Sequence, residues 1–448
     1  MPTDSLQRDA PSPATGLPSL PEIHSSLNIP HTGFWRKLFA FAGPGFLVAV
    51  GYMDPGNWAT DLAAGSKYNY TLLSVILISN FLAILLQSLA LKLGIASGRD
   101  LAQASRDNFS RPINIGFWIF AEIAIAACDL AEVIGSAIAL NLLFHIPLIW
   151  GVCLTALDVM LILFLQQKGF RFLEALVISL IGIIGACFAL EIFFSHPGAT
   201  GLLYGLFVPS NQIVRDPAML YIAISILGAT VMPHNLYLHS ALVQTRRFER
   251  TPEGKRQAIR FSTIDSTFAL TLAFFVNAAI LIVSAATFYT RGMNQVAEIQ
   301  DAHKLLTPLL GVTGASTIFA LALLASGQNS TLTGTLAGQV VMEGFLNIRL
   351  KPWLRRLITR GIAILPAIVV TVFWGERGTA NLLVLSQVVL SMQLSFAVIP
   401  LVMFTGNRKL MGEFVNKTTF NIVAWATTVI MIGLTVWWLY GQLSGGAG

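Results

Sequence analysis

Four consecutive residues, Asp54-Pro55-Gly56-Asn57, place a carboxylate and a carboxamide beside two residues that interrupt helices. They follow an apolar run from Leu38 to Met53, and a weaker segment of small residues continues from Trp58 to about Ser66. Together these segments could cross a bilayer, which takes roughly 20 helical residues. A charge at that depth survives only where it faces a polar cavity, and proline and glycine disfavour a continuous helix. We expect a broken helix that presents the acid, the amide and free carbonyls to a cation; a proline-kinked helix with a paired aspartate is the alternative.

A second apolar segment is interrupted in the same way. It runs from Tyr221 to about Leu242, and its middle reads Gly228-Ala229-Thr230-Val231-Met232-Pro233-His234-Asn235. Two hydrophobic segments broken by proline beside polar residues are typical of the substrate site of a secondary transporter. The two breaks lie near the starts of two five-segment halves, where an inverted repeat would place them.

If the two breaks meet at the midplane, they offer the Asp54 carboxylate, the Asn57 carboxamide, a carbonyl freed near Ala229 and the Met232 thioether. Oxygen ligands alone would suit Na⁺, Mg²⁺ or Ca²⁺, whereas a thioether binds those hard ions poorly and tolerates Mn²⁺, Fe²⁺, Co²⁺ or Cd²⁺ better. A lone methionine is usually core filling. Because Met232 lies beside a helix-breaking proline and opposite the first break, we favour metal ligation for it.

The third apolar segment, roughly Ile113 to Leu143, carries the acids Glu122, Asp129 and Glu132 near one helical face. Each costs about 2.5–3.5 kcal/mol at the bilayer centre unless it is paired or hydrated. We favour a hydrated acidic stripe or proton path over pairing with basic residues of other helices. The ninth segment opens with three arginines that are either cytoplasmic anchors or partners for these acids: Arg355, Arg356 and Arg360.

Two histidines follow the second break. His234 and His239 are five residues apart, about 140° around a helix, so both imidazoles would not reach one metal ion. Because histidine titrates near neutral pH, we interpret them as protonatable groups near the site. An ordinary hydrogen-bonding role is an equal alternative for each.

Composition indicates a polytopic helical membrane protein. The 448 residues are 55% hydrophobic and only 11% charged, with mean hydropathy +0.70, whereas about a quarter of the residues of soluble domains are charged. Eleven spans are predicted, centred near residues 52, 83, 127, 157, 182, 232, 276, 322, 364, 391 and 430. With a cytoplasmic N-terminus, all Lys and Arg lie on the cytoplasmic side except Lys67, Arg215, Arg291, Lys304 and Arg377. This distribution follows the positive-inside rule, so the net charge of +6 reflects topology and not nucleic-acid binding.

The remaining features are mostly structural. Cys128, Cys153 and Cys187 lie in predicted spans without CxxC spacing, which favours small apolar packing over a disulfide or zinc site. Residues 1–32 are rich in Pro, Ser and charge, and we expect a disordered cytoplasmic tail. Residues 33–448 would form one transmembrane domain, with repeats at about 38–195 and 217–405 and a peripheral helix at about 418–441. Asp158 has no assigned role.

The motifs resemble those of the Nramp family of divalent metal transporters. The resemblance rests on Asp54-Pro55-Gly56-Asn57, on residues 232–240 (MPHNLYLHS) and on the run from Gly327 to Gln339, and it extends over all eleven spans. It implies an all-α, LeuT-like fold with inverted repeats of five helices and broken helices one and six. The metal ligands that it implies are Asp54, Asn57, the Ala229 carbonyl, Met232 and, in some states, Gln387. It also implies a polar network for protons, formed by His234, Glu122, Asp129, Glu132, Arg355 and Arg356, with His239 and Asn277 nearby.

The implied function is proton-coupled import of Mn²⁺ or Fe²⁺ by alternating access, without a cofactor or catalytic residue. We expect a protein of the cell (inner) membrane that acts as a monomer, with its N-terminus in the cytoplasm and its C-terminus outside. Met232 argues against the magnesium-transporting relatives, which lack the methionine. The alternatives are a sodium-coupled amino-acid or organic-solute carrier of the same fold and, less favoured, an intramembrane enzyme, whose HExxH or Gly-Asp motifs are missing.

Overall fold

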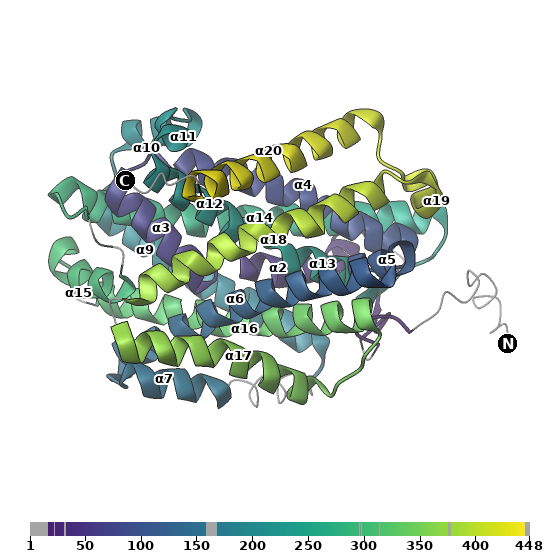
Figure 1. The fold of residues 1–448 in the computed structure, drawn as a ribbon, viewed down its shortest axis with the longest axis horizontal. Coiled ribbons are helices and arrows are strands. Elements are labelled where there is room, and N and C mark those ends of the chain that lie inside the picture. Colours follow the sequence, from purple (N-terminus) through teal and green to yellow (C-terminus); the bar gives the residue numbers. More distant parts are fainter. Residues whose placement is uncertain are drawn as a thin grey trace.

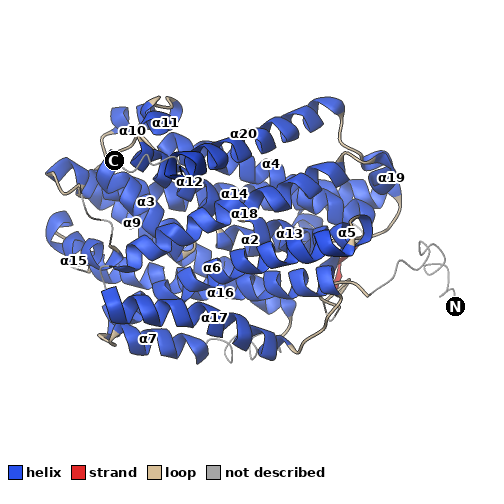
Figure 2. Ribbon diagram, viewed as in Figure 1, coloured by secondary structure: helices blue, strands red, loops and turns tan. Residues whose placement is uncertain are grey.

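The structure is a computed structural model that describes residues 17–21, 23–30, 33–157, 168–294, 296, 298–312, 314–374 and 378–443. Nearly all of this part of the chain is helical, and most long helices run along the long axis of the molecule (Figures 1 and 2). The described strands are β1 (Leu27–Asn28) and β2 (Arg246–Arg247), which pair in parallel. The predicted all-α membrane fold is therefore confirmed.

Both predicted helix breaks are present. The first divides α2 (Pro44–Gly51) from α3 (Pro55–Tyr68), and the second divides α12 (Pro217–Thr230) from α13 (Pro233–Leu242). In each pair the two halves follow one another along the long axis (Figure 1). Proline occupies the first turn of all four halves, where its missing N–H costs no hydrogen bond. At the two breaks, Pro55 and Pro233 thus interrupt the span and begin its second half.

Long unbroken helices surround the broken ones. Seven spans of the described chain are long and apolar enough to cross a membrane, and one of them is the second broken helix. The predicted first span falls below this measure because it is broken, the eighth because it is polar in the middle, and the ninth because its apolar part covers only Arg360–Phe373. The described part of the fourth span ends at Leu157. The long helices are α4 (Leu73–Ser97), α6 (Arg111–Phe144), α9 (Phe170–Ser195), α14 (Pro252–Thr287), α16 (Ala315–Leu346), α17 (Pro352–Trp374), α18 (Thr379–Thr405) and α20 (Thr418–Leu443).

Short helices connect them at the two ends of the bundle. Asp158 and the second half of the fourth predicted span lie outside the described residues. The short α-helices are α1 (Phe34–Phe41), α5 (Leu101–Asn108), α7 (Leu148–Leu154), α10 (Ala199–Phe207), α11 (Gln212–Arg215), α15 (Ile299–Leu310) and α19 (Arg408–Met411). The 3₁₀ turns are η1 (Thr155–Leu157), η2 (Val243–Thr245), η3 (Tyr289–Arg291) and η5 (Gly412–Phe414).

Helix packing places the breaks in the centre. Helix α6 packs against α16, α17 and α18, while α14 packs against α2, α3 and α4. Helix α20 contacts mainly α18 and α12 at one edge of the bundle, as predicted for a peripheral helix (Figure 1). The broken helices are therefore enclosed on all sides by unbroken ones.

The prediction of a disordered tail over residues 1–32 is wrong for its last part. Strand β1 pairs with β2, Leu20 is buried, and its N–H donates to Glu343 Oε2 at 3.1 Å. Residues 17–21 and 23–30 thus lie across one end of the bundle, held by backbone hydrogen bonds that a composition rich in proline and serine does not indicate.

Candidate cation site

The two breaks meet through the Asn57 side chain. Its Nδ2 donates to Asp54 Oδ1 at 2.7 Å and, across the interface, to the Ala229 carbonyl at 3.1 Å. Asp54 also caps α3 by accepting the Asn57 backbone N–H at 2.8 Å. Three of the predicted ligands therefore lie within one hydrogen-bonded group.

Two glycines allow Met232 and Gln387 to approach. A methyl group on Gly51 would lie 3.2 Å from the Met232 sulfur, and one on Gly56 would lie 1.7 Å from Gln387 Nε2 and 3.1 Å from Asp54 Oδ2. Any side chain at Gly56 would displace the Gln387 amide. The structure thus brings Asp54, Asn57, Ala229 and Gln387 together, and it places the Met232 sulfur beside Gly51, three residues before Asp54.

The carbonyls at the first break accept hydrogen bonds from neighbouring side chains. The Tyr52 carbonyl accepts the Asn277 amide at 2.8 Å, and the Met53 carbonyl accepts Trp58 Nε1 at 3.2 Å and the Ser326 hydroxyl. Asn277 Nδ2 also donates to Asn57 Oδ1 at 3.1 Å. Asn277, predicted as part of the proton network, therefore lies directly behind Asn57.

The site is closed to both faces of the bundle. Asp54, Ala229, Met232 and Gln387 have no exposed surface, and Asn57 is 1% exposed. Asp54 Oδ2 and Gln387 Oε1 are buried and have no hydrogen-bond partner among the residues that the structure describes. An unpaired buried carboxylate oxygen is costly unless a cation or proton joins it. The donor set of one carboxylate, two amides, one carbonyl and one thioether could supply that cation's ligands.

The acids of α6 divide into two groups. Glu122 is half-buried and accepts Trp118 Nε1 at 3.1 Å, one turn away. Asp129 and Glu132 are buried deeper and lie 3.8 and 3.5 Å from Arg360, which is itself 1% exposed. The pairing that we had placed second is therefore present for Asp129 and Glu132. The side chains of Arg355 and Arg356 lie outside the described part of α17.

The two histidines lie in different surroundings. His234, one residue after the proline of the second break, is 1% exposed, and its Nδ1 has no hydrogen-bond partner. His239 Nδ1 lies 2.9 Å from Gln87 Oε1, and Gln87 Nε2 donates to the Tyr52 hydroxyl at 2.7 Å. His239 thus takes part in a chain that returns to the first break.

Sequence reasoning missed a second buried ion pair. Arg246 Nη1 lies 2.6 Å from Glu174 Oε1, and each side chain is 1% exposed. Asp265 nearby accepts the backbone N–H groups of Gly43 and Gly45 at 3.2 and 2.7 Å. The available signal was an acid, Glu174, within a mostly apolar span, and it raises the same question as the acids of α6.

The chain is similar to proteins of a known family over almost its whole length. The profile of the natural resistance-associated macrophage protein-like (Nramp) family matches residues 45–441. The chain is 63% identical to a protein of Nostoc sp. named divalent metal cation transporter MntH, over 97% of this chain and 98% of that protein. It also resembles the crystal structure of an Eremococcus coleocola manganese transporter, with 42% identity and a TM-score of 0.88 over 96% and 93% of the two chains.

A more distant structure agrees on the fold. Mhp1, a nucleobase-cation-symport-1 family transporter in a closed conformation, has a TM-score of 0.60 at 15% identity, over 89% of this chain and 90% of that one. The expected LeuT-like architecture is thereby confirmed, since the two chains share the fold at low identity. The chain belongs to the Nramp family, and it is a membrane transport protein and not an enzyme.

Proposed function

We propose that this protein is a proton-coupled secondary transporter that imports divalent transition metal ions by alternating access, with Mn²⁺ as the first candidate and Fe²⁺, Co²⁺ and Cd²⁺ as others. The observation that carries the proposal is the buried Asp54 carboxylate oxygen, which has no hydrogen-bond partner among the described residues, at a break that faces the one carrying the Met232 thioether. The names of the MntH relative and of the manganese transporter support the same substrate class.

The ligand types favour a borderline cation that can leave again. One carboxylate gives a single negative charge, so a dication is attracted but not held as tightly as by several acids. The thioether lowers the relative affinity for Ca²⁺ and Mg²⁺. Asn57 Nδ2 now holds Asp54 Oδ1 and the Ala229 carbonyl together. A cation among these oxygens would replace the amide hydrogens in that role.

Proton coupling is proposed from the neighbouring charges. Asp54 must be deprotonated to bind metal, so metal and proton compete for it. His234, Asp129 and Glu132 are buried, and the two acids share one arginine, Arg360. A proton displaced from Asp54 would pass toward this group and then to the cytoplasm. The basic loops support the orientation that is part of this proposal, with the N-terminus in the cytoplasm and the C-terminus outside the cell membrane.

The test is Mn²⁺ uptake into proteoliposomes with an inward proton gradient, followed by metal- and pH-sensitive dyes. Wild type should take up Mn²⁺ and acidify the lumen, whereas Asp54→Asn, which keeps the shape and cap, should do neither. Calorimetry with Mn²⁺ should show binding to wild type only. Uptake without acidification would remove the proton from the proposal, and no binding of Mn²⁺ would remove the metal.

The alternative is a sodium-coupled organic-solute carrier, because Mhp1 shows that this fold is shared beyond metal transporters. The thioether beside Asp54 argues against it, since neither Na⁺ nor an organic carboxylate gains from sulfur. Uptake of amino acids under a sodium gradient and no pH gradient separates the two, because only the sodium-coupled carrier would accumulate them.

A further inference from the structure

A second sulfur lies beside the candidate cation site. Cys128 of α6 is 2% exposed and belongs to a small cluster of buried side chains with Met232 and Leu390 of α18. From the sequence we interpreted Cys128 as a small apolar packing residue. Its neighbour in space, however, is the thioether of the proposed ligand set, which packing alone does not require.

The thiol also faces the acids. Cys128 Sγ donates to Glu132 Oε1 at 3.7 Å, and Asp54 lies close enough to interact with it electrostatically. Asp54 Oδ2 is fully buried without a hydrogen-bond partner, which independently marks this space as one that a cation would occupy. Cys128 therefore lies between the proposed ligands and the pair formed by Glu132 and Arg360.

We propose that Cys128 is a specificity-determining residue of the cation site, whose sulfur acts beside Met232 to favour soft dications such as Cd²⁺ over Mn²⁺. The inference rests on the proposed function and extends it. When a soft dication binds, a sulfur–metal bond forms and the S–H bond breaks. Glu132 Oε1, which already accepts the thiol hydrogen bond, is placed to take the proton. No oxidant or further reactant is needed.

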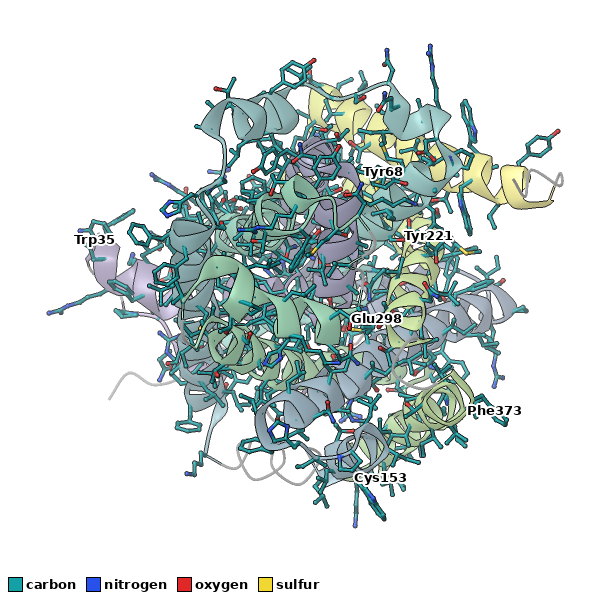
Figure 3. All side chains as sticks on the ribbon, turned by 90° about the vertical axis from the view of Figure 1, so that its left-hand side faces the viewer. Trp35, Tyr68, Cys153, Tyr221, Glu298 and Phe373 are labelled. Atoms are coloured by element: carbon teal, nitrogen blue, oxygen red, sulfur yellow. The ribbon has the colours of Figure 1, made fainter. Side chains whose placement is uncertain are left out.

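A matched control exists in the same chain. Cys187 of α9 is also buried and also precedes a glutamate, Glu191, by four residues, as Cys128 precedes Glu132. It does not belong to the cluster of Cys128 and Met232. Cys153, in contrast, is exposed at the rim of the bundle (Figure 3). Cys187→Ser thus removes a similar thiol without touching the site.

The experiment compares Cd²⁺ and Mn²⁺ binding by calorimetry to the purified full-length protein as wild type, Cys128→Ser, Cys128→Ala and Cys187→Ser. We expect both Cys128 variants to lose at least about 10-fold in Cd²⁺ affinity and less than about 3-fold in Mn²⁺ affinity. Cys187→Ser should match wild type for both ions. An unchanged ratio of Cd²⁺ to Mn²⁺ affinity in the Cys128 variants would overturn the proposal.

A second measurement needs no substitution. Cadmium bound to a thiolate absorbs in the near ultraviolet by charge transfer, so titration of wild type with Cd²⁺ should produce this band as the site fills. Saturation with Cd²⁺ without the band would also overturn the role of Cys128. If wild type bound neither ion, the proposed metal transport itself would fail, which is a different result from a missing band.

Discussion

Single residues at the breaks carry the chemistry. Asp54 and Asn57 could be predicted as ligands because a carboxylate and an amide beside proline and glycine are costly in an apolar span. Their partners across the interface were harder to predict, since nothing local to Gln387 or Asn277 distinguishes either from an ordinary hydrogen-bonding residue. Only the fold shows that Gly56 leaves room for one and that Asn57 contacts the other.

Replacing the thioether should change selectivity more than folding. In Met232→Ala we expect the preference for Mn²⁺ or Cd²⁺ over Ca²⁺ to fall by roughly 10-fold, because the remaining donors are oxygens that suit hard ions. Competition of Ca²⁺ against Mn²⁺ uptake measures this. Met219→Ala is the control. Met219, in helix α12, is buried as Met232 is, but it packs in a different cluster. Equal Ca²⁺ competition in wild type and Met232→Ala would contradict the prediction.

Arg360 should be required for stability as well as for charge balance. Removing it in Arg360→Leu leaves Asp129 and Glu132 without their described cation, and breaking a buried pair typically costs about 3–5 kcal/mol. Thermal unfolding in detergent should show a clear fall in Tm, with a smaller fall for Arg360→Lys. The sequence could not choose this arginine, because Arg355, Arg356 and Arg360 share one helix start and only the packing of α17 on α6 separates them. An unchanged Tm would show that the acids are stabilised by other groups.

At the scale of elements, helix α2, the first half of the first broken helix, is held at its N-terminal end by hydrogen bonds and close packing. Arg171 and Arg246 both donate to the Ala42 carbonyl at 2.7 Å, and Asp265 accepts from Gly43 and Gly45. Gly43 has φ +137°, and a methyl group there would lie 2.4 Å from the Glu174 carboxylate. The positions of the breaks follow from proline, but the N-terminal end of α2 depends on contacts from α9 and α14 that no local pattern predicts.

Gly43→Ala should therefore loosen helix α2. We expect faster hydrogen exchange in Pro44–Gly51 and a lower Tm, because strain at positive φ adds to a clash with a buried carboxylate. Gly98→Ala separates the two causes, since Gly98 also has positive φ (+69°) but no atom within 4 Å of the added methyl. A loss as large in Gly98→Ala would attribute the effect to backbone strain alone.

The α4–α5 connection should make stability depend on pH. Asp100 caps α5 by accepting the Gln103 N–H at 2.9 Å, and burial raises its pKa to about 6. Since the folded state holds the proton more tightly than the unfolded state, this group favours folding below about pH 4 and loses that contribution as pH rises through about 6. The Tm of wild type relative to Asp100→Asn should therefore fall between about pH 4 and 6. A constant difference would contradict the raised pKa.

At the scale of the whole molecule, the proposed transport through a closed site would require the ends of the bundle to move. The inverted repeat was predictable because both halves begin with a proline-broken span, whereas the ordered tail was not, because its order comes from other segments. The tail residues 17–21 and 23–30 connect distant segments at one end of the bundle, which we call the basic end because the basic β2 strand, Arg246–Arg247, lies there. Gln103 of α5 donates to the Leu17 carbonyl at 3.2 Å, Glu343 of α16 accepts from Leu20, and β1 pairs with β2, which follows α13 and η2.

Fastening this bridge should therefore stop transport without abolishing binding. Asn28 and Arg247 are partners in the two-stranded sheet and both are exposed, so a disulfide between Asn28→Cys and Arg247→Cys is geometrically reasonable. In a Cys153→Ser background, which removes the exposed native thiol, oxidation should lower Mn²⁺ uptake at least about 10-fold, because a linked tail restrains the half-helix α13 against α5 and α16. Reduction should restore uptake, and each single-cysteine variant should transport under both conditions. If the linked protein binds Mn²⁺ and transports it at the wild-type rate, the tail remains in place during release, and the basic end must open elsewhere.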